Sequence, residues 1–264
     1  NLDSVIYISS YPGARLSAYD PAKPYRYGEG PDGNPRELGR IDDISYRPRS
    51  TLAGPLGRVW RASVPDYGVW GGPLSWYDPA SGEKKAYYRI AGDGSCYTLA
   101  HLDREKLIAV GTSIGGGSGT QPKIDRASLF RGDYAAEEKV WEGAPDDRVS
   151  AAFNALCATA DGLLVGTITG GDGPGLFVFD PAKRMFSDIM TLPGGNPLDN
   201  GLQVGPDGYV YGFTAGSLYR FDVSSREITT VYAGEDAFEV AGPIAGNDIC
   251  FAKGHLLKSM RIFE

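Results

Sequence analysis

The sequence predicts an all-β protein assembled from one repeated unit of turns and short strands. In the clearest copy, Asp207-Gly208 marks a tight turn, and Tyr209 to Phe213 forms a strand of aromatic and β-branched residues. Ala215-Gly216 marks a second turn, and Leu218 to Phe221 makes the next strand. The 37 glycines, 18 prolines and 16 tyrosines among the 264 residues are typical of such a turn-rich β protein.

The same pattern recurs along the whole chain, and its spacing predicts a β-propeller. The copies follow one another at intervals of roughly 40–55 residues, close to the length of a propeller blade. They begin at Asp3, Gly57, Lys106, Asp161, Asp207 and Asn247. With the four strands of a blade named A to D from the axis outward, each copy supplies strands B and C.

Flanking segments supply the other two strands of each blade. Candidates for the inner A strand are small and apolar, as crowding near the axis requires, and candidates for the outer D strand alternate more. The predicted A strands are Ser50 to Ala53, Tyr97 to Ala100, Phe153 to Ala158, Gly201 to Val204 and Phe238 to Val240. The predicted D strands are Arg26-Tyr27, Ala86 to Tyr88, Lys139 to Trp141, Met185 to Ile189 and Ile228 to Tyr232. The sequence therefore predicts a single β-propeller domain of four-stranded antiparallel blades over residues 1–264.

Both ends of the array lack a strand. The first copy opens at the turn after strand A, and the last closes where strand C ends. Because incomplete blades would expose strand edges, we expect the domain to be incomplete at both ends. Six repeats are visible, and the sequence leaves open whether the missing strands close these blades or add another in a seven-bladed ring.

Two motifs carry a resemblance to a known superfamily. The Asp-Gly-x-Val-Tyr turn and strand at 207–211, echoed at 161–165, and the Leu-x-x-Tyr/Phe-Asp-Pro corner at 16–21, 74–79 and 176–181 resemble the repeats of the seven-bladed β-propeller superfamily. Its members include the YVTN, quinoprotein-like and kelch-like groups, which contain sugar lyases, lactonases, dehydrogenases and scaffolds. The resemblance implies a fold and a range of functions.

The Asp-Pro corners are predicted to be structural. We expect Asp20, Asp78 and Asp180 each to accept hydrogen bonds from backbone N–H groups just beyond it, while the following proline presets the turn.

The composition of the chain limits the classes of partner that we expect it to bind. With a net charge of −7 and a pI near 5.0, we expect neither nucleic acid nor a membrane as a partner. Cys96, Cys157 and Cys250 lack metal-binding spacing and are expected to be buried free thiols, with a Cys96–Cys157 bridge or a reactive thiol as alternatives. No metal site or cofactor is predicted. The Gly115 to Gly119 run lacks the residues of a phosphate-binding loop. Asp172 offers a single carboxylate, which is too few ligands for calcium.

The resemblance implies that ligands meet the face formed by the B–C and D–A loops, at the mouth of the central channel. Asn154, Asp199 and Arg148 fall on that side of the blades. The candidate ligand-binding residues there are Arg15, Arg47, Arg49, Tyr67, Trp70 and Asn200. The arginines, with Arg61, would clamp a carboxylate, and the aromatic side chains would stack on a sugar ring.

Two residues are candidates for proton transfer. His255, in the last B–C loop, and Tyr11, in the first, are the predicted catalytic residues. His101 falls at the far end of an inner strand and is expected to be structural.

Two functions of different classes follow from these residues. The first is binding of an acidic sugar or a similar small polar ligand, by a polysaccharide lyase or a glycoside hydrolase. In a lyase, neutralising the uronate carboxylate would acidify the neighbouring C–H. The alternative is a non-catalytic scaffold whose partner is another protein. The sequence does not decide whether the chain is an enzyme.

Overall fold

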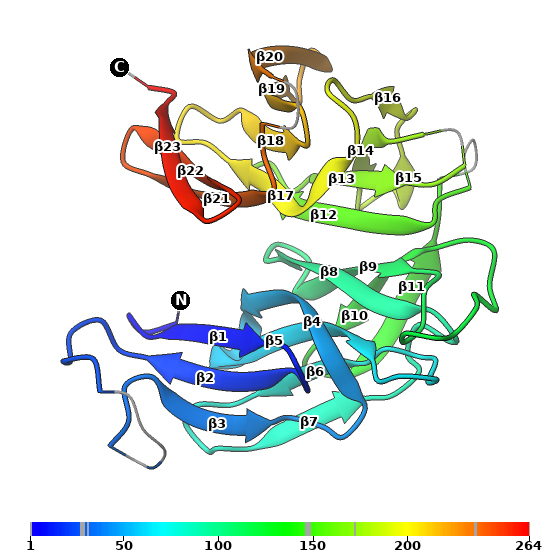
Figure 1. Ribbon diagram of the computed structural model, residues 1–264. Coiled ribbons are helices and arrows are strands. Elements are labelled where there is room, and N and C mark those ends of the chain that lie inside the picture. The colour runs from blue at the N-terminus through cyan, green and yellow to red at the C-terminus, as the bar shows by residue number, and fades with distance from the viewer. Residues whose placement is uncertain are drawn as a thin grey trace.

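The computed structural model describes residues 2–26, 30, 32–145, 149–171, 173–234 and 237–263, and Figure 1 shows them as successive β-sheets around one axis. Blade 1 contains β1 (Ile6–Ser10), β2 (Arg15–Tyr19) and β3 (Arg36–Arg40). Blade 2 contains β4 (Ser45–Ala53), β5 (Val59–Pro65), β6 (Leu74–Tyr77) and β7 (Lys84–Tyr87). Blade 3 contains β8 (Ser95–Leu102), β9 (Leu107–Ser113), β10 (Leu129–Asp133) and β11 (Glu138–Gly143).

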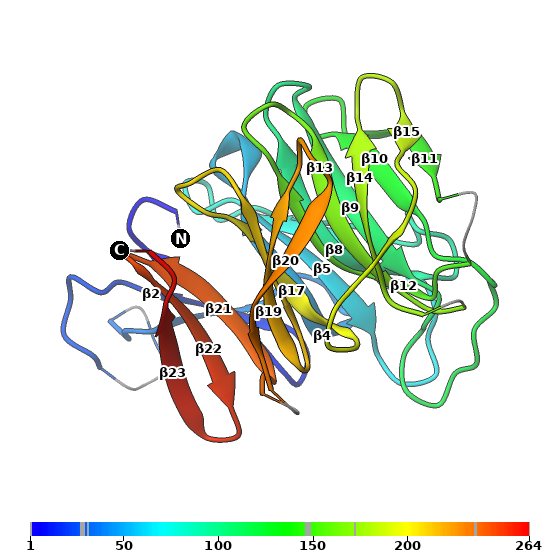
Figure 2. The same cartoon turned by 90° about the horizontal axis from the view of Figure 1, so that it is seen from above.

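The second half of the chain repeats the arrangement. Blade 4 contains β12 (Ala152–Ala158), β13 (Leu164–Thr169) and β14 (Gly175–Asp180), with an outer edge of β15 (Met185–Phe186) and β16 (Met190–Thr191). Blade 5 contains β17 (Pro197–Val204), β18 (Val210–Thr214), β19 (Ser217–Asp222) and β20 (Glu227–Ala233). Blade 6 contains β21 (Val240–Ala245), β22 (Asp248–Lys253) and β23 (Leu256–Arg261). Seen from above, these three blades stand face to face in chain order (Figure 2).

The all-β prediction is confirmed. Every strand pairing is antiparallel, and the only helical turn among the described residues is the short 3₁₀ segment Pro55–Gly57. The predicted tight turn at Asp207-Gly208 and its counterpart at Asp161-Gly162 also form. Gly162 and Gly208 have φ of +90° and +84°, a conformation that favours glycine, and each donates its N–H at 3.0 Å to the carbonyl three residues earlier.

The outer strands differ most from the sequence prediction. In blade 1 the outer strand is β3 and not Arg26-Tyr27, because Arg26 makes only an isolated bridge to Asn34, and Tyr27 lies outside the described residues. The predicted strand Met185 to Ile189 is divided between β15 and β16. These edge strands pair on one side only, so the sequence pattern constrains them least.

The Asp-Pro corners form as predicted. The Oδ1 of Asp20 accepts the N–H of Ala22 at 3.0 Å, and the Oδ1 of Asp180 accepts the N–H groups of Ala182 and Lys183 at 3.0 and 3.1 Å. Asp78 makes the same turn with the two residues after Pro79.

The hydrophobic core consists of separate clusters between neighbouring blades. Trp60 and Trp76 of blade 2, for example, pack against Ile108 and Phe130 of blade 3. Burial of such large side chains contributes roughly 1.5–3 kcal/mol each, so face-to-face packing holds the blades in order. The three cysteines are free thiols, so the alternative of a disulfide bridge is excluded.

Candidate functional site

The inner strands carry β-bulges that set polar side chains toward the axis. The pairing of β4 with β5 skips Arg49, that of β8 with β9 skips Tyr97, and that of β12 with β13 skips Asn154. The pairing of β17 with β18 skips residues 198–201, which include Asp199. A bulge leaves one residue unpaired and re-aims its side chain. Four consecutive blades therefore each bring a polar residue to the same level of the axis.

These four residues meet around one carboxylate, and we call Arg49, Tyr97, Asn154 and Asp199 the Asp199 network. Asp199 Oδ2 accepts hydrogen bonds from the Tyr97 hydroxyl at 2.9 Å and from Arg49 Nη1 at 3.3 Å. Asp199 Oδ1 accepts one from Asn154 Nδ2 at 3.0 Å. Arg49 and Asp199 are 150 residues apart in sequence, so only the circular arrangement of the blades brings them together.

Further contacts hold the side chains of the Asp199 network in place. The Arg49 guanidinium lies 4.9 Å from the centre of the Tyr97 ring, and Asn154 Oδ1 accepts the Thr169 hydroxyl at 3.1 Å. Asn200 Nδ2 donates to the Arg49 carbonyl at 2.6 Å, which fixes the bulge. Burial, and then the Asp199 carboxylate, raise the pKa of Tyr97 well above its usual range, so its hydroxyl stays protonated and donates.

A second cluster lies where β4 begins, and we call Tyr11, Tyr46, Arg47 and Tyr67 the tyrosine–arginine cluster. Tyr46 packs edge-on against Tyr11 and Tyr67, with ring centres 5.4 and 5.5 Å away. The Arg47 guanidinium carbon is 5.7 Å from the Tyr11 ring centre and 5.5 Å from that of Tyr67. Tyr11 and Tyr67 are 57% and 56% exposed, so the cluster offers two ring surfaces with a cation between them.

Arg47 differs from the other arginines of the candidate set. Within the described part of the chain its side chain makes only one hydrogen bond, a long one of 3.5 Å from Nη2 to the Tyr67 hydroxyl, and no carboxylate there forms an ion pair with it. Arg15 pairs with Glu37 at 3.3 Å, and Arg49 pairs with Asp199. The charge of Arg47 is therefore the one in this set that no described carboxylate neutralises.

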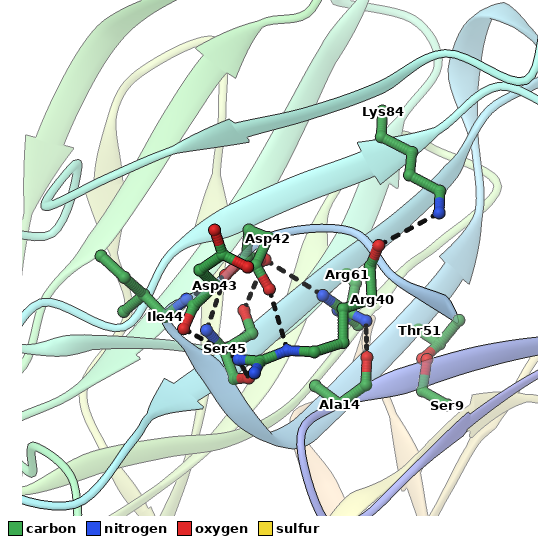
Figure 3. A network of polar contacts seen from close by, with 10 residues as sticks. All are labelled: Ser9, Ala14, Arg40, Asp42, Asp43, Ile44, Ser45, Thr51, Arg61 and Lys84. Carbon is green, nitrogen blue, oxygen red and sulfur yellow. Dashed lines mark hydrogen bonds and ion pairs between the residues drawn. The ribbon is translucent and has the colours of Figure 1, made fainter. Parts of the chain in front are cut away.

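Arg61 was expected to clamp a carboxylate ligand, and the structure places it in the interior instead. Its side chain and that of Asp42 are both fully buried, with Arg61 Nη2 3.1 Å from Asp42 Oδ2 (Figure 3). Arg61 also donates to the Ala14 carbonyl. Asp42 further accepts the Ser45 hydroxyl at 2.8 Å and the N–H groups of Ile44 and Ser45 at 3.0 and 2.6 Å. This arginine supports the fold and has no access to a ligand.

The buried pair lies directly behind the tyrosine–arginine cluster. The Ala14 carbonyl accepts a hydrogen bond from Arg61, and the Ala14 N–H donates to the Tyr46 carbonyl at 3.0 Å. The Ile44 carbonyl accepts the N–H of Asp66 at 2.9 Å, next to Tyr67. The backbone under the exposed rings is thus tied to the Asp42–Arg61 pair.

The remaining predicted residues lie outside both clusters. The Trp70 indole donates to the Gln121 carbonyl at 2.9 Å, and Lys123 lies 3.6 Å from its ring centre. His255 is exposed at the tip of the β22–β23 hairpin, and among the described residues it makes no recorded contact with either cluster. His101 packs against the ring of Tyr134. Arg148 and Asp172 lie outside the described residues.

Tyr97 and Thr169 are members of the site that sequence reasoning missed. Tyr97 was assigned to an apolar inner strand, although its hydroxyl belongs to the Asp199 network. A signal was available in two blades, because Tyr97 and Asn154 are each a polar or polar-tipped residue within an otherwise small or apolar inner strand. Arg49 directly precedes the predicted inner strand Ser50 to Ala53, so its correspondence to them is visible only when the copies are aligned.

The described residues contain neither a cluster of metal ligands nor a membrane-spanning helix. No group of three or more His, Cys, Asp or Glu side chains there is placed to hold a metal ion. Nor is any helix in that part of the chain long and apolar enough to cross a membrane.

Comparison with known proteins gives the fold and no narrower family. No family model and no curated protein matches the sequence. Among solved structures, virginiamycin B lyase from Staphylococcus aureus has a TM-score of 0.68 at 14% identity, covering 98% of this chain and 82% of its own. A chain of the nidogen/laminin complex has a TM-score of 0.66 at 11% identity, with coverages of 97% and 88%.

A third structure is similar over a part of its length only. The extracellular domain of the one component system BT4673 from B. thetaiotaomicron has a TM-score of 0.64 at 15% identity, and this chain covers 33% of it. The chain thus spans about a third of that protein. At identities this low the likeness concerns the fold, and the protein is a β-propeller, as its repeats predict.

Proposed function

We propose that this β-propeller binds an acidic saccharide at the tyrosine–arginine cluster. The observation that carries the proposal is Arg47, an arginine without a described carboxylate partner that lies between the exposed rings of Tyr11 and Tyr67. A uronic acid would satisfy both features at once. Its carboxylate would accept hydrogen bonds from the guanidinium, and its apolar C–H face would lie against a tyrosine ring.

The contacts support binding more than turnover. A lyase needs a base beside the carbon next to the uronate carboxylate, and the predicted base His255 makes no recorded contact with the cluster among the described residues. Tyr97 is unsuited to that role because its raised pKa keeps it protonated. Virginiamycin B lyase has a similar fold, but at 14% identity the likeness concerns the fold alone and carries no catalytic residue over to this chain.

Calorimetric titration with a short uronic acid oligosaccharide tests the proposal. The matched ligand is the same oligosaccharide with its carboxylates reduced to alcohols. Loss of a charge-assisted hydrogen bond costs roughly 1.5–3 kcal/mol, so the reduced ligand should bind at least about tenfold more weakly. Arg47→Gln should show the same loss, while Arg15→Gln, which removes a more exposed arginine that is paired with Glu37, should bind like the parent protein.

Two results would overturn the proposal. One is equal affinity for the acidic and the reduced ligand, and the other is the absence of binding, which would favour the protein-binding scaffold. Incubation of the oligosaccharide with the protein, followed by near-ultraviolet absorbance, measures lyase turnover separately. We expect none, and new absorbance that disappears in Tyr11→Phe or His255→Ala would replace a binding function with an enzymatic one.

A further inference from the structure

The Asp199 network has hydrogen-bonding capacity that its own members do not use. A carboxylate can accept about four hydrogen bonds, and Asp199 accepts three from the described residues, two at Oδ2 and one at Oδ1. Arg49 donates to Asp199 through Nη1, whereas no hydrogen bond of its Nη2 is recorded among those residues. The side chains of Arg49 and Asp199 are 34% and 35% exposed. An acceptor and a donor are thus both accessible at one place.

This place lies next to the tyrosine–arginine cluster. Arg47 and Arg49 are two residues apart in β4, which corresponds to roughly 7 Å along a strand. The first contacts the exposed tyrosine rings, and the second contacts Asp199. A ligand that contacts both arginines would therefore extend from Arg47 toward Asp199.

The charges of the two places differ. Arg47 lacks a described carboxylate partner, whereas Arg49 is neutralised by Asp199 at 3.3 Å. A second anionic group near Asp199 would meet a like charge, which is unfavourable at short distance. A neutral hydroxyl pair meets no such repulsion, because one hydroxyl can donate to the carboxylate and the other can accept from the guanidinium.

We propose that Arg49 and Asp199 form a subsite for a neutral sugar, so that the preferred ligand places an uncharged hexose beside the uronic acid. This inference rests on the proposed function and specifies its substrate class. Tyr97 and Asn154 position the Asp199 carboxylate, and Thr169 in turn holds Asn154. The subsite is therefore ordered before a ligand arrives, which lowers the entropy lost on binding.

Three calorimetric probes test the inference. They are glucuronic acid, a disaccharide of a uronic acid and a neutral hexose, and a disaccharide of two uronic acids. We expect the parent protein to bind the mixed disaccharide at least tenfold more tightly than the di-uronic acid. Asp199→Asn keeps the shape and removes the charge, so it should reduce this preference to threefold or less and change the affinity for glucuronic acid by less than twofold.

The outcomes separate this inference from the proposal on which it rests. If Arg47→Gln weakens all three probes but the parent shows no preference between the disaccharides, the neutral-sugar subsite is wrong and the acidic-saccharide site stands. If none of the probes binds, both are wrong. An equal loss for all probes in Asp199→Asn, with a lower melting temperature, would show that Asp199 is structural and would also overturn the subsite. The preference of the parent protein remains decisive if that variant does not fold.

Discussion

Two arginine–aspartate pairs of this propeller have nearly the same geometry and opposite surroundings. The nitrogen–oxygen distance is 3.1 Å in Arg61–Asp42 and 3.3 Å in Arg49–Asp199. The first pair is completely buried, and Asp42 has four hydrogen-bond donors, as many as a carboxylate accepts. The second pair is about one-third exposed, and Asp199 has three donors among the described residues.

The difference shows what decides whether such a pair stabilises the fold or is available to bind a ligand. A buried pair has lost its hydration, so removing one partner leaves an uncompensated charge in the interior. A partly exposed pair keeps water contacts, and its net contribution to stability is small. The capacity that Asp199 leaves unused is what a ligand could occupy. Substitutions at the two pairs should therefore change different measured quantities.

The largest expected effect is on stability at the buried pair. Arg61→Ala leaves Asp42 without its counter-charge and removes a donor from the Ala14 carbonyl, so the free energy of unfolding should fall by about 3–5 kcal/mol. Urea unfolding measures this loss. The matched control is Arg15→Ala, whose exposed ion pair should be worth about 1 kcal/mol or less. A loss at Arg61 as small as that of the control would contradict the comparison.

An intermediate effect is expected at an Asp-Pro corner. Asp180 accepts two backbone N–H groups, so its carboxylate is engaged like that of Asp42 but is closer to solvent. Asp180→Ala should lower the free energy of unfolding by about 1–2 kcal/mol. Saccharide affinity should not change. Lost affinity at an unchanged melting temperature would assign this corner to the binding site.

A smaller stability effect is expected at the exposed pair. Arg49→Ala should lower the free energy of unfolding by about 1 kcal/mol or less, because the pair is solvated. Its main consequence should be weaker binding of the mixed disaccharide. If Arg49→Ala instead destabilised the fold as much as Arg61→Ala, the Asp199 network would be a structural tie between blades.

The smallest expected effect is a pH dependence. Backbone hydrogen bonds lower the pKa of Asp78, Asp180 and Asp222 below their ordinary value of 3.8. Because the pKa is lower in the folded than in the unfolded protein, the stabilisation is present above pH 3.8 and is lost as the pH falls below it. Melting temperatures measured from pH 5 to pH 2.5 should decline, and less steeply in Asp180→Asn. An identical slope in that variant would show that this corner does not contribute.

The sequence predicted the blades because their signals are local. Tight turns such as Asp207-Gly208 and corners such as Asp180-Pro181 depend on residues a few positions apart, and they formed as expected. The outer strand of blade 1 was placed wrongly at Arg26-Tyr27, since a long loop precedes β3 and an edge strand has only one neighbour to fix it.

Most residues of the candidate site could be predicted from the sequence, but their grouping in space could not. Tyr11, Arg47 and Tyr67 come together, and Arg49 joins Asp199 instead. Arg61 has the same side chain as Arg47 and lies in the next strand, yet Arg61 is buried and Arg47 lies against the exposed tyrosine rings. The burial of the two side chains differs because residues of blade 1, such as Ala14, pack against Arg61. That contact joins segments that are distant in sequence.

By itself, then, the sequence determined the repeat, its turns and the types of residue near the axis, because these depend on short-range backbone preferences and alternation. The tertiary structure decided which charges are neutralised and which remain accessible. Bulges at matching positions of four inner strands direct Arg49, Tyr97, Asn154 and Asp199 to one point. No local pattern specifies that convergence, because it results from the packing of successive blades around a common axis.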